Sequence, residues 1–365
     1  MIFGSGVVLA ADFNKGLEAA QSGDFKTALA EWTPLAEQGD SDAQYNVGLM
    51  YFNGWGVPEN DKTAVKWLTK AAEQGYAMAQ HNLGLMYKYG EGVPENDKTA
   101  AMWFTLAAEQ GDAKAQFNLG LMYDLGLGVI ENNKTAVKWY TLAAEQGDAK
   151  AQYNLGLMYK YGNGVLENDK TAVKWYTLAA EQGYAMAQHN LGLMYKYGEG
   201  VPENDKTAAM WFTLAAEQGD AKAQFNLGLM YDLGLGVIEN NKTAVKWYTL
   251  AAEQGDAKAQ YNLGLMYKYG NGVLENDKTA VKWYTKAAEQ GLADAQYNLG
   301  LMYANGWGVL TDNRRAYMWY NLGSYNGSEN AGKNKDIIAT QMTPGDISKA
   351  QEMSSRCLES NYTDC

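Results

Sequence analysis

Few side chains in this sequence could do chemistry, and the only two histidines, His81 and His189, are the obvious candidates. They occupy equivalent positions in two copies of one sequence block, three repeat units apart. At roughly 10 Å per stacked helical layer, three units would separate them by roughly 30 Å, too far for one active site or metal site. We therefore interpret both as variants of an exposed aromatic position.

Other catalytic or cofactor patterns are absent from the sequence. It contains no GxSxG, no Walker loop and no HExxH. The stretch GEGVPEN has two of the glycines of a dinucleotide loop, but it follows a helical pattern instead of a strand. Asp40 and Asp42 are not followed by the alternating oxygen ligands of a calcium loop. We predict no enzyme activity, no cofactor and no metal.

Charge and hydropathy limit the partners. The net charge is −12 and no basic run occurs, which argues against nucleic acid. No apolar stretch approaches the ~18 residues of a membrane span. We expect a monomer with a protein or peptide partner.

The sequences at the two ends of the chain suggest in which cellular compartment the protein is located. The start, MIFGSGVVLAAD, is similar to the tail of a secretory leader, although its charged beginning is missing, so residues 1–11 are a truncated leader, a cloning remnant or a disordered start. Cys357 and Cys365 could form a disulfide in an exported protein or stay free in a cytosolic one. We expect a periplasmic, secreted or cell-surface protein, with a cytoplasmic location as the alternative.

A repeat of 36 residues organises the chain. The tetrapeptide AEQG begins at Ala36, Ala72, Ala108, Ala144, Ala180, Ala216, Ala252 and Ala288. Eight units follow one another over residues 40–327, after a degenerate unit at 12–39 and before a capping segment at 328–365. The block 76–183 returns as 184–291 with one difference, Leu178 against Lys286. This duplication extends a regular array.

Each unit predicts two helices, as unit 148–183 illustrates. In the first, Asp148 is placed as the N-cap, and Gly162 and Gly164 allow positive φ in the closing loop. Its apolar face is spaced i, i+4, i+7 and i+8 and consists of Ala151, Leu155, Met158 and Tyr159. The second helix starts at Asn168 and Asp169, and its apolar face is Ala172, Trp175, Tyr176 and Ala179.

One hairpin cannot cover its own apolar face, so neighbouring hairpins must stack. The recurring tryptophans are interpreted as core wedges, and they are Trp67, Trp103, Trp139, Trp175, Trp211, Trp247, Trp283 and Trp319. Gly156 and its equivalents are expected where adjacent units approach closely. Near the end of the chain, Thr343 as a cap and Pro344 at the first helical position predict a closing helix. The fold class is all-α, a solenoid of 36-residue helix-turn-helix repeats.

The repeated pattern A-x-x-x-L-G-x-x-Y-x-x-G-x-G-V, then A-x-x-W-Y/F, then A-A-E-Q-G resembles the Sel-one-like repeat family, a relative of the tetratricopeptide repeats. The resemblance covers about residues 12–327. It implies a right-handed α/α superhelix that acts as an adaptor for protein complexes, often exported in bacteria, and it implies no reaction. Helicobacter members carry a cysteine pair in every repeat, a feature that these repeats lack.

Positions at which the units differ suggest a protein-binding surface on the first helices, formed by two rows of equivalent side chains. One row is Tyr45, His81, Phe117, Tyr153, His189, Phe225, Tyr261 and Tyr297. Seven residues later, on the same helix face, lie Phe52, Lys88, Asp124, Lys160, Lys196, Asp232, Lys268 and Ala304. The alternative is that the aromatic row packs between neighbouring first helices.

Two further rows have open interpretations. The asparagines could hold the extended backbone of a partner or only bond the adjacent loop, and they are Asn46, Asn82, Asn118, Asn154, Asn190, Asn226, Asn262 and Asn298. A leucine row on the second helices, Leu106, Leu142, Leu178, Leu214 and Leu250, is expected to be buried between successive second helices.

The leading hypothesis is a noncatalytic scaffold that binds a protein segment along the concave face of the solenoid. An envelope hydrolase or cell-wall enzyme with a site in the groove is the alternative from another class, and a purely structural spacer is the third.

Overall fold

The computed structural model describes residues 11–365, and in this range it contains twenty helices and no strand, which confirms the all-α prediction. All but Ala11 of the suggested leader remnant lies outside the described residues. The helices are α1 (Phe13–Gln21), α2 (Phe25–Glu37), α3 (Ser41–Asn53), α4 (Asp61–Glu73), α5 (Ala77–Tyr89), α6 (Asp97–Glu109), α7 (Ala113–Leu125), α8 (Asn133–Glu145), α9 (Ala149–Tyr161), α10 (Asp169–Glu181), α11 (Ala185–Tyr197), α12 (Asp205–Glu217), α13 (Ala221–Leu233), α14 (Asn241–Glu253), α15 (Ala257–Tyr269), α16 (Asp277–Ala288), α17 (Ala293–Asn305), α18 (Asn313–Tyr325), α19 (Glu329–Ala339) and α20 (Pro344–Glu359).

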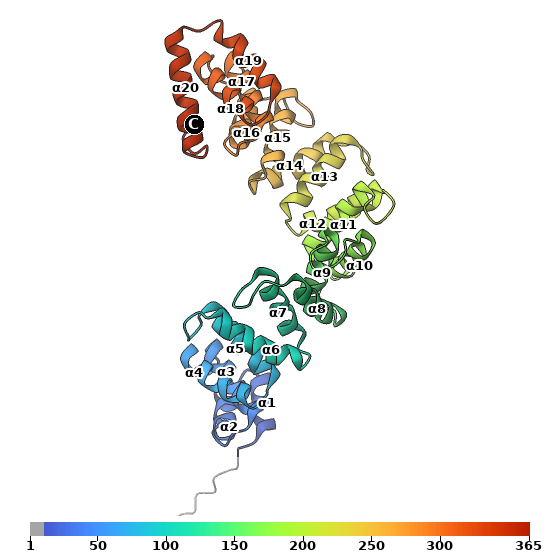
Figure 1. Cartoon of the computed structure of the whole chain (residues 1–365), viewed down its shortest axis with the longest axis vertical. Coiled ribbons are helices and arrows are strands. Elements are labelled where there is room, and N and C mark those ends of the chain that lie inside the picture. The colour runs from blue at the N-terminus through green and yellow to red at the C-terminus, as the bar shows by residue number, and fades with distance from the viewer. Residues whose placement is uncertain (1–10) are drawn as a thin grey trace, which may run out of the picture. The chain divides into compact units, whose positions relative to one another are not determined.

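The chain divides into two compact units, one ending at Gln182 and the other beginning at Gly183. The first unit contains α1 to α10 and the second contains α11 to α20. Within each unit the helices form antiparallel hairpins that stack in chain order (Figure 1). The predicted solenoid of helix-turn-helix repeats is confirmed.

Local capping explains where the helices begin and end. The Asp148 carboxylate accepts a hydrogen bond from the Ala151 amide at 2.8 Å, and Gly162 ends α9 in the left-handed region with φ 69°. The Asn168 side chain accepts from the Thr171 amide at 3.0 Å and so starts α10. Each bond satisfies an amide that the first turn leaves without a partner, which is why Asp and Asn are favoured there.

The hydrophobic cores join each repeat to the next as well as the two helices of a hairpin. One cluster joins α8 to α9 through Tyr140 and Leu155, and Trp175 from α10 packs against it. Trp175 therefore packs against the core formed between its own repeat and the preceding one, as predicted. Trp175 is partly buried, whereas Trp247, Trp283 and Trp319 are buried. Full burial of a tryptophan contributes roughly 4 to 6 kcal/mol of hydrophobic free energy as an upper bound, so stacking holds the array together.

The recurring Leu-Gly pair serves a contact inside one hairpin. A Cβ built on Gly156 would lie 2.6 Å from the ring of Tyr176, and both residues belong to the α9–α10 hairpin. The expectation of a close approach between adjacent units is wrong at this position. The Cδ1–Cε1 edge of the ring lies against the backbone of the first helix, and a side chain at residue 156 would collide with it.

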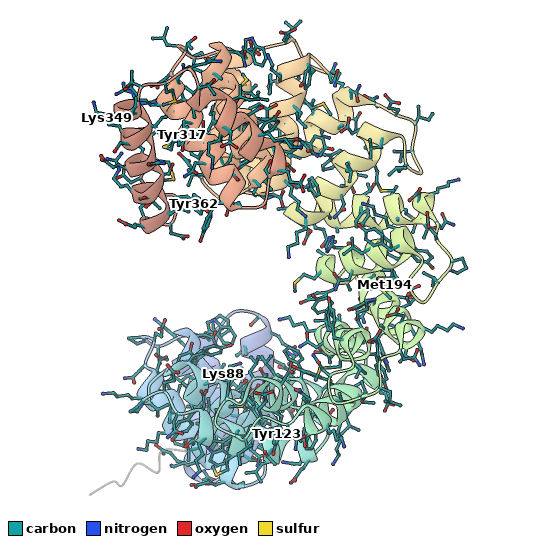
Figure 2. All side chains as sticks on the ribbon, turned by 45° about the horizontal axis from the view of Figure 1, so that its top comes forward. Lys88, Tyr123, Met194, Tyr317, Lys349 and Tyr362 are labelled. Carbon is teal, nitrogen blue, oxygen red and sulfur yellow. A yellow bond between two sulfur atoms is a disulfide. The ribbon has the colours of Figure 1, made fainter. Side chains whose placement is uncertain are left out.

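Helices outside the eight repeats pack at each end of the array in the described part of the chain. At the start, the Trp32 indole donates to the Phe13 carbonyl at 3.1 Å and ties α2 to α1. At the other end, Thr343 caps α20 as predicted, and a disulfide joins Cys357 to Cys365. Tyr362, labelled in Figure 2, bonds Asn326 at the end of α18.

The capping segment contains one helix more than the sequence pattern indicated. Asn334 on α19 donates to the Tyr297 hydroxyl on α17 at 3.4 Å, and α19 packs on α18. It therefore takes the place of one more first helix before α20 covers α18.

Candidate protein-binding surface

The aromatic and asparagine rows meet between successive first helices. The Asn82 amide on α5 donates to the Tyr45 hydroxyl on α3 at 3.4 Å, and Asn118 lies 3.4 Å from His81. In the second unit, Asn298 donates to the Tyr261 hydroxyl at 3.5 Å. Within each unit the first helices thus lie side by side, and these asparagines bond the ring of the preceding repeat and not the adjacent loop.

The aromatic row is packed into the repeat rather than presented to solvent. The ring of Tyr153 lies 6.0 Å from that of Tyr176 on the second helix of the same hairpin. His81 lies 5.8 Å from Phe104 and is only 8% exposed, and His189 is 9% exposed. The interpretation of the histidines as exposed is wrong, because their rings fill the space between two first helices and a second helix. Burial lowers the pKa of both.

We call the row from Phe52 to Ala304 the charged row. Its side chains make most of their contacts inside the hairpins. Lys160 pairs with Asp169 at 3.0 Å, and Lys268 pairs with Asp277 at 2.9 Å. The Tyr140 hydroxyl donates to Asp124 at 3.2 Å, and burial raises the pKa of that carboxyl.

The remaining charged positions have similar local contacts. Tyr248 donates to Asp232 at 3.1 Å, and Lys196 donates to Asn226 at 3.4 Å. The Lys88 ammonium lies 5.4 Å from the ring centroid of Tyr89. Each of these charged side chains therefore contacts another residue of the same chain.

A further face of the first helices lies one helical step away from the predicted rows. On α9 it consists of Lys150, Asn154, Leu157 and Tyr161, spaced i, i+4, i+7 and i+11, of which Asn154 and Leu157 are partly buried. Tyr161 is 65% exposed. We call this surface the first-helix face. The exposed apolar residues at its end are Tyr89, Leu125, Tyr161, Tyr197, Leu233 and Tyr269.

Sequence reasoning found the asparagines of this face but missed its leucine and tyrosine positions. The predicted rows consist of positions at which the units differ, whereas the leucine is the same in every unit. The signal that could have found them is the helical spacing from Asn154 to Leu157 and Tyr161, opposite Leu155.

The leucine row on the second helices is not buried. Leu106 is 40% exposed and Leu142 is 36% exposed, so the expectation for this row is wrong. The row lies on the outer side of the second helices, where Lys70 replaces leucine and places its ammonium 4.3 Å from the Trp67 ring centroid. This is a second, more weakly exposed apolar row.

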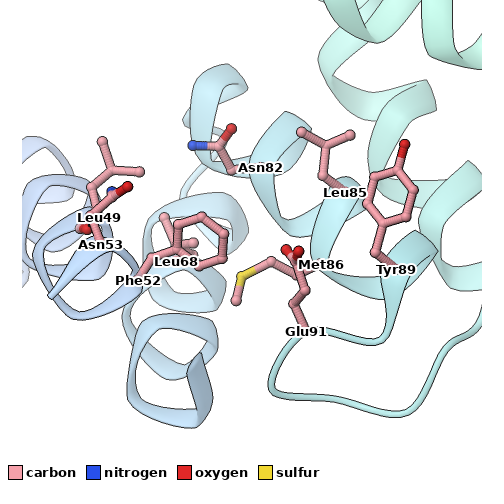
Figure 3. A pocket seen from close by; sticks show the side chains of 9 residues that line it. All are labelled: Leu49, Phe52, Asn53, Leu68, Asn82, Leu85, Met86, Tyr89 and Glu91. Carbon is pink, nitrogen blue, oxygen red and sulfur yellow. The ribbon is translucent and has the colours of Figure 1, made fainter. Parts of the chain in front are cut away.

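A pocket opens on the first-helix face between α3, α4 and α5. It encloses about 400 Å³ and is lined by Leu49, Phe52, Asn53, Leu68, Asn82, Leu85, Met86, Tyr89 and Glu91. Figure 3 shows Phe52, Leu68 and Met86 close together, with Glu91 beside them. Phe52 and Asn82 come from the predicted rows, and the structure brings them together here.

The pocket has a cause in the sequence of repeat 40–75. The buried residue that faces the Leu-Gly pair is Leu68 here, whereas the equivalent residues are Phe104, Tyr140 and Tyr176 in the following repeats of the first unit. Leucine fills less of the space beside the first helix than an aromatic ring does. The next repeats have a ring where repeat 40–75 has a hollow.

Within residues 11–365, no cluster of three or more His, Cys, Asp or Glu side chains could hold a metal ion. In the same range, no helix combines the length and the apolar character needed to cross a bilayer.

Comparison with known sequences settles the family. The sequence model described as Sel1 repeat matches eight consecutive segments, 41–76, 77–112, 113–148, 149–184, 185–220, 221–256, 257–292 and 293–328. The chain belongs to the Sel1 repeat family. Its segments have the predicted period, with boundaries one residue later than those drawn from the sequence.

Solved structures agree with this assignment. A Sel1 repeat protein from Oxalobacter formigenes is 34% identical, with 89% of this chain and 94% of that chain covered and a TM-score of 0.65. A protective antigen of uropathogenic Escherichia coli with an SLR fold is 31% identical, covers 96% of both chains and has a TM-score of 0.58. None of the curated proteins compared with this Sel1 repeat chain matches it.

Proposed function

We propose that this Sel1 repeat protein is a noncatalytic scaffold that binds a protein or peptide segment along its first-helix face. The observation that carries the proposal is the pocket on this face, continued within the first unit by the exposed Tyr89, Leu125 and Tyr161. Exposed apolar side chains in a row, with amide groups beside them, are typical of a surface that receives a partner.

The face offers two kinds of contact to an extended segment. Leu157 and Tyr161 supply apolar area, and aromatic side chains such as Tyr161 are frequent energetic centres of interfaces. The amide of Asn154, which already hydrogen-bonds Tyr140 of the preceding repeat, lies beside them and leaves its remaining hydrogen-bonding capacity for the partner. The asparagine and the leucine recur in all eight repeats, and the position of Tyr161 is tyrosine or leucine in six of them. A longer segment therefore meets more copies, and affinity grows with the number of repeats engaged.

Export is part of the proposal. The disulfide between Cys357 and Cys365 supports an oxidising compartment, where such bonds persist. The Escherichia coli relative is described as a protective antigen, and we take this description as support for export. We propose that this chain lies in the periplasm or outside the cell.

Deletion of one cassette tests the proposal. Removing residues 184–291 keeps the AEQG junction, because Gly183 then precedes Leu292 as Gly291 does now. The probe is selected from a phage-displayed library of random 30-residue peptides on the full chain, because an extended segment of that length, roughly 100 Å, exceeds the five repeats that remain. We expect a graded loss, with binding weakened several-fold but retained. Abrupt loss of all binding, or a library that yields no binder, would contradict the proposal.

A further inference from the structure

Repeat 40–75 lacks a cation that repeats 148–183 and 256–291 place against the start of their second helix, through Lys160 with Asp169 and Lys268 with Asp277. Where the charged row has lysine, the first residue of the second helix is aspartate, and the pairs are Lys88 with Asp97, Lys160 with Asp169, Lys196 with Asp205 and Lys268 with Asp277. Where the row has aspartate, at 124 and 232, that residue is asparagine. In repeat 40–75 the row has Phe52, yet the aspartate, Asp61, remains.

A second carboxylate lies at the same place. In repeat 256–291 the Lys268 ammonium lies 2.9 Å from Asp277 and 4.0 Å from the ring centroid of Trp307, which comes from the next repeat. The residue equivalent to Trp307 at the pocket is Glu91. Burial, with the charge of Asp61 as a smaller cause, raises the pKa of Glu91.

The loop of Glu91 rests directly on the start of α4. A Cβ built on Gly92 would lie 2.5 Å from the carbonyl carbon of Asp61, so the two carboxylates belong to one corner of the structure. Within the described part of the chain, neither Glu91 nor Asp61 takes part in an ion pair. The nearest lysine of α5, Lys88, lies over the ring of Tyr89 instead.

The pocket therefore combines an apolar interior with unneutralised negative charge at its edge. Phe52, Leu68 and Met86 provide the apolar wall, and Glu91 lies beside Met86 (Figure 3). A side chain with an aliphatic stem and a positive end complements both parts, because lysine and arginine bury their stems on apolar surface and keep the charge at a polar rim. Aromatic faces such as that of Phe52 also attract cations.

We propose that this pocket receives a lysine or arginine side chain from the bound protein segment, which supplies the cation that repeat 40–75 lacks. The proposal rests on the proposed function and adds the chemistry of the partner at one position. The stem lies against Phe52 and Leu68, and the charge lies between Glu91 and Asp61. The net charge of −12 favours the approach of such a basic segment.

The test uses variants that give repeat 40–75 the residues of its sisters. Phe52→Lys supplies the missing cation internally, and Leu68→Tyr fills the hollow. Ala304→Lys is the matched control, because it adds the same charge at the equivalent position of repeat 292–327. Dodecapeptides are selected from a random phage library on the full chain and measured as synthetic fluorescent peptides by anisotropy. Circular dichroism and thermal melting check that each variant is folded.

We expect the selected peptides to share a lysine or arginine, and to bind Phe52→Lys and Leu68→Tyr at least tenfold more weakly. Ala304→Lys should change the affinity less than twofold. Replacement of the shared basic residue by norleucine, which keeps the stem and removes the charge, should also weaken binding at least tenfold.

The inference is overturned if the peptides show no basic preference, or if they bind both pocket variants as they bind the unaltered chain. Peptides that keep binding in these variants but lose it in Tyr161→Glu would leave the scaffold function standing and remove only the pocket assignment. A library without binders would count against both.

Discussion

Repeats 40–75 and 148–183 form the same helical hairpin but differ in the side chains that pack between its two helices. Both place a glycine of the first helix against a side chain of the second, Leu68 in one and Tyr176 in the other. Repeat 148–183 neutralises its helix start with Lys160, whereas repeat 40–75 has Phe52 there. A regular array can thus keep its stacking and still create one distinctive site through two side chains.

The glycine contact should show the largest effect. Gly156→Ala places a methyl group 2.6 Å from the rigid Tyr176 ring, so we expect a loss of about 3 kcal/mol in the free energy of unfolding. Gly48→Ala meets Leu68, a smaller and more flexible side chain with the hollow beside it, and should cost clearly less. Urea unfolding followed by circular dichroism measures both, and equal losses would contradict the difference between the hairpins.

Exchanging the filling residues should have the next largest effect. Tyr176→Leu removes a buried ring and should cost about 2 kcal/mol, because a cavity replaces packed atoms. Leu68→Tyr should not destabilise the chain, since the hollow accepts the ring. A strong loss of stability in Leu68→Tyr, measured in the same urea titration, would show that the hollow is not the space that sister repeats fill.

The ion pair should matter less. Lys268→Met keeps the stem and removes the charge that faces Asp277, and we expect a loss of about 0.5 to 1 kcal/mol because the pair is partly solvated. The loss should shrink as salt concentration rises. A loss that is unchanged between low salt and 1 M salt would indicate packing by the stem instead of charge.

The smallest expected effect is the pH dependence that His81 gives to its repeat, compared with Phe117 in the next one. Burial holds the pKa of His81 below the unfolded value of about 6.5, so the unfolded chain takes up the proton first as pH falls. The contribution is complete above about pH 6.5 and is lost as pH falls toward the folded pKa. Neighbouring charges act in opposite directions, Asp112 raising the pKa and Lys114 lowering it.

The matched variant is His81→Phe with His189→Phe, which copies the residue of Phe117. Its thermal midpoint should fall less than that of the unaltered chain between pH 7 and pH 5.5. Parallel decreases in both proteins would contradict the assignment of this pH dependence to the histidines.

Much of the fold followed from local sequence. Asp148 and Asn168 are caps for reasons confined to one helical turn, and the period of AEQG made stacking necessary. The partner of Gly156 did not follow, because a single sequence does not say whether a tight contact lies within a hairpin or between hairpins. The predicted direction of each first-helix face was also wrong by one helical step. The prediction therefore placed the buried His81 on the surface and did not find the exposed Tyr161.

The pocket was out of reach for a related reason. Leu68 looks like any other apolar core residue until the rings of its sister repeats, such as Tyr140, are placed on the same backbone. The missing lysine opposite Asp61 was present in the printed repeats, but its meaning depends on the contact seen between Lys268 and Asp277.

The central claim is that the first-helix face, and not the outer row of the second helices, carries binding. The most direct test compares Tyr161→Glu with Leu142→Glu, measuring by fluorescence anisotropy the affinity of one peptide selected on the full chain. We predict that Tyr161→Glu weakens binding at least tenfold and that Leu142→Glu changes it less than twofold. Unchanged affinity in Tyr161→Glu, together with loss in Leu142→Glu, would contradict the account.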